Sequence, residues 1–187
     1  IRAVKTHDEM AGLMGGTMRK FGGSFFGSYV HDDAKDPEKY TVYLVQGGLG
    51  LPDRDYYLED RFKTQKAAYE AYVAQMLTLA GWERPAENAK AIVALETEIA
   101  KVSWTRAERR DDDKTYNPFE IAKLQEYAPG FAWKQYLDGA HLTKADRVVV
   151  SENTAFPKIA AIYANTPIET LKAWSAFNLT DQAAPYL

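Results

Sequence analysis

Apolar residues recur at helical spacing along most of this chain, and they change to strand spacing in only one region. The stripe from Ile92 to Val102, for example, advances in alternating steps of three and four residues, which places its members on one face of a helix. Because strands and helices do not alternate, a doubly wound parallel sheet is disfavoured. We predict a mainly α fold with a β-hairpin, in which a bundle-like group of helices covers residues 6–21, 60–80, 85–102, 117–128, 133–137, 155–165 and 166–177.

The region of strand spacing covers residues 25–30 and 40–45, which are rich in aromatic and β-branched side chains. The segment between them, 31–39, is polar and contains Pro37, so we predict a hairpin with a long, charged loop. Both faces of the second strand are apolar, and we expect other elements to cover both. The three valines at 148–150 predict one further short strand.

Two helix starts carry the pattern of a capping box. Thr6 is followed three residues later by Glu9, and Thr166 is followed three residues later by Glu169. We therefore expect each threonine hydroxyl to accept a backbone N–H from the first turn of its helix. The first of these helices is expected to end at Gly22-Gly23.

Glycine and proline mark the limits of three other helices. Gly81 fits the position just after the long helix 60–80, and Pro85 fits the first position of the next helix. The turn between them is short, so we expect an antiparallel helix pair. Asn117-Pro118 carries the same start signal for a helix that Pro129-Gly130 would end.

The composition excludes several classes of protein. The chain has 187 residues, no cysteine and a formal net charge of −3, so disulfides, cysteine-ligated zinc and thiol catalysis are ruled out. No run of Lys and Arg is long enough for a nucleic-acid patch, and no apolar run approaches ~18 residues. We therefore predict no nucleic-acid partner and no membrane span in this chain. No low-complexity linker divides it, which indicates one domain or one contiguous piece of a larger domain.

The glycine-rich stretch 46–60 poses the main chemical question. Gly48-Leu49-Gly50 begins like a dinucleotide-binding fingerprint, but the third glycine is missing, and so is the Gly-Lys-Ser/Thr ending of a Walker loop. The simpler interpretation is a sharp turn from a strand into a helix, in which glycines supply positive φ angles.

Asp53 and Asp55 could form a catalytic carboxylate pair in the same stretch. Nothing in the sequence marks either residue as desolvated. The favoured interpretation is that they cap the segment 54–58 and that Arg54 pairs with one of them.

The remaining polar residues point to no site. His7, His31 and His141 lie far apart and none belongs to an H-E-x-x-H motif, although a long-range three-histidine site stays open. Arg106, Arg109 and Arg110, with the aspartates 111–113, could bind an ion, but a solvated turn is the favoured interpretation. Serine-based catalysis has no G-x-S-x-G motif. The triplet 178–180 matches a glycosylation sequon, which is a pattern common by chance.

The stretch 46–57, Q-G-G-L-G-L-P-D-R-D-Y-Y, closely resembles the G-L-G-L-P-x-R-D-Y-Y signature of peptidase family M13, the neprilysin, endothelin-converting-enzyme and PepO-type zinc metallopeptidases. Later residues also follow the family's order. They are Arg109 to Asp111 with Tyr116-Asn117, then Phe131-Ala132-Trp133, and then Asp146 before the valines 148–150. The resemblance spans essentially the whole chain. It implies that residues 1–187 are part of the family's N-terminal, helical, non-catalytic cap domain, truncated at both ends.

The resemblance also implies where the chemistry lies. In this family an H-E-x-x-H helix supplies two zinc ligands and a general base, a later glutamate completes the site, and an upstream arginine binds the substrate's carboxylate. None of these motifs occurs in this sequence, so no catalytic, metal-binding or cofactor-binding residue is assigned to it. Zinc is expected in the absent catalytic domain of the parent protein.

The implied function is a part of a zinc-dependent metalloendopeptidase. This piece would help to enclose a cavity that admits small peptides, and it would be inactive alone. Its implied partners are the catalytic domain of the same polypeptide and small peptide substrates. The implied location is extracytoplasmic, in bacteria the periplasm. Two alternatives stay open, a free-standing helical module that binds a peptide or protein, and a hydrolase that uses Asp53 or Asp55.

Overall fold

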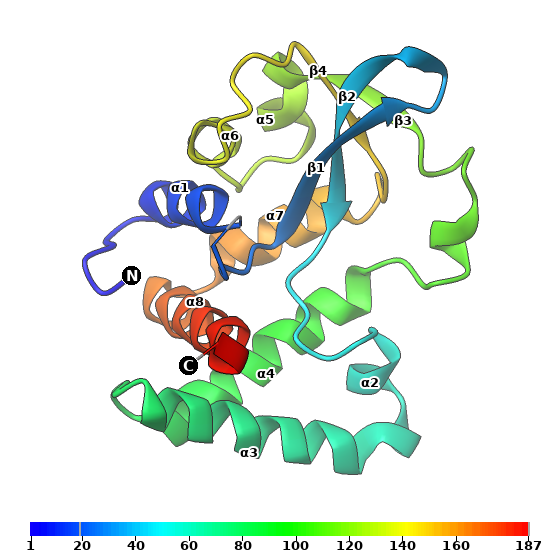
Figure 1. Ribbon diagram of the computed structural model, residues 1–187. Helices are drawn as coiled ribbons and strands as arrows, with labels where there is room; N and C mark the ends of the chain where they lie inside the picture. The colour runs from blue at the N-terminus through cyan, green and yellow to red at the C-terminus, as the bar shows by residue number, and fades with distance from the viewer. Residues whose placement is uncertain (19, 187) are drawn as a thin grey trace.

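The computed structural model describes residues 1–18 and 20–186. Over these residues it has eight α-helices and one four-stranded sheet, which confirms a mainly α fold with a β-hairpin (Figure 1). The helices are α1 (His7–Thr17), α2 (Asp55–Leu58), α3 (Lys63–Leu79), α4 (Pro85–Val102), α5 (Leu124–Tyr127), α6 (Trp133–Gly139), α7 (Phe156–Asn165) and α8 (Ile168–Ala183). The strands are β1 (Phe26–Asp33), β2 (Asp36–Gln46), β3 (Asn117–Glu120) and β4 (Arg147–Val150), and four 3-10 turns are η1 (Asp60–Phe62), η2 (Glu108–Arg110), η3 (Ile121–Lys123) and η4 (Ala184–Tyr186).

The sheet has the order β1-β2-β4-β3. The hairpin β1–β2 is antiparallel, β4 runs parallel to β2 with Val42 opposite Val148, and β3 runs antiparallel to β4. Both the hairpin and the strand of valines were expected. The buried positions of β2 lie at 41–44, where both of its faces are covered, but Tyr40 is 78% exposed.

The hairpin loop is much shorter than the long, charged loop predicted at 31–39. β1 continues to Asp33 and β2 begins at Asp36. The Tyr43 hydroxyl accepts the Ala34 N–H and donates to the Asp32 carbonyl, so a side chain satisfies the turn's backbone groups. Pro37 is tolerated because it has no partner on either side: the β1 register jumps from Tyr40 to Asp36, and β4 pairs with β2 only at 42–44.

The predicted helix start at Asn117-Pro118 is wrong, because this segment forms the edge strand β3. The Asn117 amide donates to the carbonyls of Lys114 and Val150 rather than serving as a helix cap. The expected helix shrinks to η3 and the single turn α5.

The two predicted capping boxes have different outcomes. The Thr6 hydroxyl accepts the Glu9 N–H at 3.2 Å, as expected, although the Glu9 carboxylate accepts from Lys5. The box at Thr166 is wrong, because its hydroxyl donates to the Ile162 carbonyl of the preceding helix. The first helix also ends at Thr17, before the predicted stop at Gly22-Gly23.

Helices α3, α4 and α8 pack together below the sheet in Figure 1. The junction between α3 and α4 is as predicted, with Gly81 at a φ of +63° after α3 and Pro85 at the start of α4. Leu77 of α3, Ile92 of α4 and Phe177 of α8 belong to the same buried core. These three helices therefore form the bundle-like part of the fold.

Two consecutive phenylalanines join the sheet to the helices. The Phe25 ring lies 5.3 Å from Tyr163 and 5.1 Å from Trp174, at the side of α7 and α8. The Phe26 ring lies 4.6 Å from Trp133 and 4.7 Å from Phe156. Phe25 directly precedes β1 and Phe26 is its first residue, so the start of this strand packs against α6, α7 and α8.

Helices α1 and α6 approach each other closely through glycine. A Cβ atom built on Gly15 would overlap the Tyr136 carbonyl oxygen and lie 3.0 Å from the Ala140 nitrogen. The neighbouring Gly16 is exposed, and its Cβ would meet only the Gly139 carbonyl at 3.7 Å. Only one of these two adjacent glycines is therefore required by packing.

Candidate functional site

The glycine-rich stretch is a turn from strand to helix, as predicted. It leaves β2 at Gln46 and enters α2 at Asp55. Gly48 has a φ of +87°, which a residue with a side chain rarely adopts. A Cβ atom on Gly50 would overlap the Tyr69 hydroxyl. The two glycines thus have separate roles, one in backbone conformation and the other in close packing.

Tyr57 connects this turn to helix α4. Its hydroxyl accepts the N–H groups of Gly50 and Leu51, at 3.1 and 2.8 Å, and donates to the Glu96 carboxylate at 2.7 Å. The ring is buried. One tyrosine therefore satisfies two backbone donors of the turn and fixes its distance from α4.

Glu96 lies fully buried at the centre of this arrangement. Besides Tyr57, its carboxylate accepts the Trp174 indole N–H at 2.9 Å and the Tyr69 hydroxyl at 3.3 Å. Burial raises the pKa of Glu96 to about 7, against the opposing effect of these hydrogen bonds. Burial and the nearby carboxylate also raise the pKa values of Tyr57 and Tyr69. One acidic group thus joins the turn at 46–54, which we call the signature turn, to α3, α4 and α8.

The raised pKa predicts a pH dependence of stability. Glu96 in the unfolded chain has the ordinary value of 4.5, so between pH 4.5 and about 7 the folded state binds a proton that the unfolded state has lost. The free energy of unfolding should therefore fall by about 3 kcal/mol as the pH rises through this window. Urea denaturation at several pH values measures it. The Glu96→Gln variant should show a flatter profile, and equal slopes for both proteins would contradict the assignment to Glu96.

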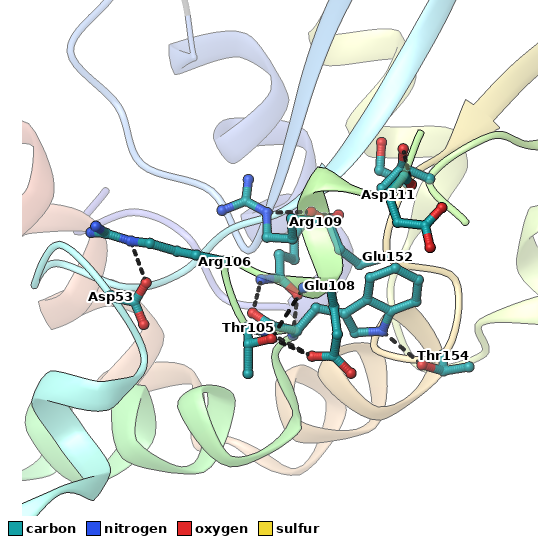
Figure 2. A network of polar contacts seen from close by, with 12 residues as sticks. Asp53, Thr105, Arg106, Glu108, Arg109, Asp111, Glu152 and Thr154 are labelled. Atoms are coloured by element: carbon teal, nitrogen blue, oxygen red, sulfur yellow. Dashed lines mark hydrogen bonds and ion pairs between the residues drawn. The ribbon is translucent and has the colours of Figure 1, made fainter. Parts of the chain in front are cut away.

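Asp53 and Asp55 do not form a free carboxylate pair. Figure 2 shows Asp53 beside Arg106, whose Nε lies 2.6 Å from Oδ2 of Asp53. The other oxygen of Asp53 accepts the Asp55 N–H at 3.1 Å, which fits the predicted capping role. The predicted pairing with Arg54 is wrong, because Arg54 instead donates to the Ser103 carbonyl at 2.8 Å.

The arginine-rich segment 106–110 is more than a solvated turn. Figure 2 shows Arg109 against Glu152, with a distance of 2.7 Å between Nε and Oε1. Glu152 is only 1% exposed, and its other oxygen accepts the Gln46 N–H at 2.8 Å. Together with the Arg106–Asp53 pair, this contact connects the segment 106–110 to Gln46 and Asp53, near the two ends of the turn.

Arg109→Ala is expected to lower the free energy of unfolding by about 2 kcal/mol, because it leaves the buried Glu152 carboxylate without a cation. Thermal or urea denaturation measures the loss. Arg110→Ala is the matched control, since no ion pair of Arg110 is present among the described residues, and its effect should stay within about 0.5 kcal/mol. Equal effects of the two variants would show that the Glu152 contact is not stabilising.

Gln46 makes a second link at the start of the turn. Its amide donates to the Trp104 carbonyl at 3.1 Å and accepts the Trp104 N–H at 2.8 Å. The Trp104 indole donates in turn to Thr154. The end of β2 is therefore joined to the segment after α4 and to the segment after β4, which lie far apart in the sequence.

The three histidines do not come together. His7 hydrogen-bonds the Thr166 carbonyl at 2.9 Å, His31 lies exposed on β1, and His141 follows α6 with a φ of +59°. Over residues 1–18 and 20–186, no three His, Cys, Asp or Glu side chains lie close enough to hold a metal ion, so these residues do not fit zinc. Asn178 of the sequon is half-buried in α8 and donates to the Trp174 carbonyl.

Two acidic residues of this network were missed in the sequence. Glu96 follows Ile92 by four residues and therefore lies on the apolar face of its helix, which is a readable signal for a buried acid. Glu152 lies two residues after the buried strand β4, and its position next to this strand is the signal for its burial. None of the helices in the described part of the chain is long and apolar enough to cross a membrane.

Comparison with known proteins identifies the family of this chain. The model of peptidase family M13 matches residues 1–187, and the chain therefore belongs to peptidase family M13. It superposes on zinc metalloprotease Zmp1 of Mycobacterium tuberculosis in complex with an inhibitor, with a TM-score of 0.93 and 31% identity, covering 100% of this chain and 29% of Zmp1. PepO from Lactobacillus rhamnosis shares the fold at a TM-score of 0.78 and 18% identity, covering 100% of this chain and 30% of PepO.

Curated relatives give the same family. An endothelin-converting enzyme homolog of Locusta migratoria is 32% identical over 152 residues, which are 76% of this chain and 21% of that protein. Human endothelin-converting enzyme 1 is 27% identical over 172 residues, 87% of this chain and 22% of the enzyme. The chain thus spans less than a third of the length of these relatives. Family membership and relatives support a peptidase-related role.

Proposed function

We propose that residues 1–187 belong to the non-catalytic N-terminal cap domain of an M13 zinc metalloendopeptidase. One observation carries the proposal, namely that the family model matches the chain from end to end while the chain spans only 21% to 30% of its relatives. The zinc ligands and the general base then belong to the rest of the parent polypeptide, which is the main partner of this chain.

In this role the chain helps to enclose the cavity in which small peptides are hydrolysed. A helical cap keeps folded proteins out and limits the access of water to the reaction. The buried network around Glu96 and Glu152 supports such a role, because it holds the signature turn in one geometry without offering a reactive group to solvent. We infer an extracytoplasmic location for the parent protein.

The test compares the parent protein with the chain 1–187. The parent should hydrolyse a quenched fluorescent peptide, lose this activity with a zinc chelator, and contain one zinc ion by mass spectrometry. The chain 1–187 should show neither activity nor stoichiometric zinc. Peptidase activity in the pure chain would overturn the proposal. A reading frame that ends near residue 187 would also overturn it and favour the free-standing binding module.

A further inference from the structure

Strand β1 is an edge of the sheet, because the strand order is β1-β2-β4-β3 and β1 pairs with β2 alone in the described chain. Hydrogen-bonded pairs alternate with non-bonded pairs along an antiparallel ladder. The Phe25 carbonyl accepts the Gly47 N–H at 2.9 Å, so the backbone groups of odd-numbered residues face β2. The N–H and C=O groups of the even-numbered residues Phe26, Ser28 and Val30 therefore point away from β2.

Both ends of this edge are closed. The Phe26 N–H donates to the Ser24 hydroxyl at 3.3 Å, and the Phe26 carbonyl accepts the Tyr136 hydroxyl at 2.6 Å. At the other end the pairing register is interrupted at residues 32–33, where the chain enters the hairpin turn. A covering element and a register irregularity are two ways in which proteins protect an edge strand. Here they protect only the ends.

The middle of the edge, residues 28–30, is open. Leu44 lies opposite Ser28 and its carbonyl accepts the Ser151 N–H at 2.9 Å, so Ser28 and Leu44 form a non-bonded pair. Over residues 1–18 and 20–186, no hydrogen bond to the backbone N–H or C=O of Ser28 or Val30 is present. Tyr29 and Val30 are 48% and 51% exposed. Two residues thus present unpaired backbone groups at strand spacing on an accessible edge.

A groove with a volume of about 240 Å³ lies beside this open edge. Ser28, Tyr29 and Val30 form one wall, and Met18 and Leu142 belong to the other. Successive residues of a strand point to opposite faces of the sheet, yet all three residues of β1 line the groove. Among the described residues, none from β2 does so. The groove therefore opens along the edge itself, on the side away from β2.

We propose that this edge binds a short extended peptide, which adds to β1 as a further strand and places an apolar side chain in the groove. The backbone of an extended peptide presents N–H and C=O groups at the spacing that Ser28 and Val30 require. Met18, Ala140 and Leu142 make the facing wall apolar, which favours an apolar side chain over a charged one. The inference does not depend on the proposed peptidase function.

A second copy of the chain fits this edge less well. A symmetric pair of β1 strands could join only the open stretch 28–30 of each copy, because Phe26 already has its partners and the register breaks at 32–33. Stable complexes between proteins bury about 1,200–2,000 Å² of surface, which so short a pairing does not approach. A peptide of a few residues needs only the open stretch and the groove.

The test adds the peptide acetyl-Lys-Thr-Val-Thr-Lys-amide to the 187-residue chain. NMR should show downfield shifts of the Ser28 and Val30 amide protons that saturate with peptide, together with slower hydrogen exchange at both positions. The same peptide with every backbone nitrogen methylated keeps its side chains but has no backbone donor. It should bind at least about tenfold more weakly.

Two variants at one position test the edge from the side of the chain. Val30→Pro removes an edge donor but no bond to β2, because the Val30 N–H points away from β2. It should bind the peptide at least about tenfold more weakly. Val30→Thr is the matched control, since it keeps the N–H and nearly the same shape, and it should bind like the natural chain. Thermal denaturation checks that each variant is folded, and the methylated peptide decides alone if Val30→Pro is not.

Three results would overturn the proposal. In the first, the Ser28 and Val30 signals stay unchanged as peptide is added. In the second, the methylated peptide or a folded Val30→Pro protein binds as tightly as the unmodified pair. The third concerns the other occupant and uses analytical ultracentrifugation without peptide. A dimer that Val30→Pro dissociates would assign the edge to a second copy of the chain.

Discussion

Glu96→Leu is expected to lower the free energy of unfolding by about 4 kcal/mol. The substitution removes the group that accepts the Trp174 indole N–H and the hydroxyl protons of Tyr57 and Tyr69. Each donor left buried without a partner costs about 1–3 kcal/mol. Leucine restores apolar volume but no acceptor, so the loss outweighs the benefit of removing a buried acid. Urea denaturation followed by tryptophan fluorescence measures the change.

Two control variants separate charge from hydrogen bonding at this position. Glu96→Gln keeps one acceptor oxygen and the shape, so a smaller loss of about 1–2 kcal/mol is expected at neutral pH. Glu98→Leu changes the same residue type on the same helix, where the side chain is 56% exposed, and it should have little effect. Equal losses for Glu96→Leu and Glu98→Leu would show that the buried network does not stabilise the fold.

Gly15→Ala is expected to cost about 3 kcal/mol or more, because the new methyl group would overlap backbone atoms of α6. A backbone carbonyl cannot rotate away as a flexible side chain can, so α1 and α6 must separate. Several core side chains of α1, such as Met10 and Met14, would then lose contacts. Thermal denaturation by circular dichroism measures the loss.

The neighbouring glycine supplies the control for this prediction. Gly16→Ala places the same methyl group in ordinary contact distance of Gly139, on the exposed side of α1. Alanine is favoured over glycine inside a helix, so this variant should gain up to about 1 kcal/mol. If both variants were destabilised equally, helix geometry rather than contact with α6 would be the cause.

The sequence predicted those elements that depend on local pattern. The α3–α4 junction followed from Gly81 and Pro85, and the signature turn followed from its glycines, because backbone conformation at these points is set by the residues themselves. β3 was missed because its strand state depends on pairing with β4, about 30 residues further along the chain. A cap signal at Asn117 could not reveal that partner.

The network could not be predicted as a unit for a similar reason. The acid Glu96 is visible on the apolar face of its helix, but its donors lie 27, 39 and 78 residues away along the chain. Hydrogen bonds between distant side chains depend on how the helices pack, which a single sequence does not specify. The role of Tyr57 therefore becomes visible only once the fold brings its hydroxyl against Glu96.

The parallel pairing of β2 with β4 has a consequence for how the chain acquires its structure. Val42 must find Val148, so the sheet closes a loop of about 100 residues, and such distant contacts slow folding. During synthesis the hairpin leaves the ribosome first and exposes one side of β2 until β4 has been made. We expect nascent chains that stop before residue 147 to display an open strand edge, which is a surface that chaperones recognise and that other chains can pair with.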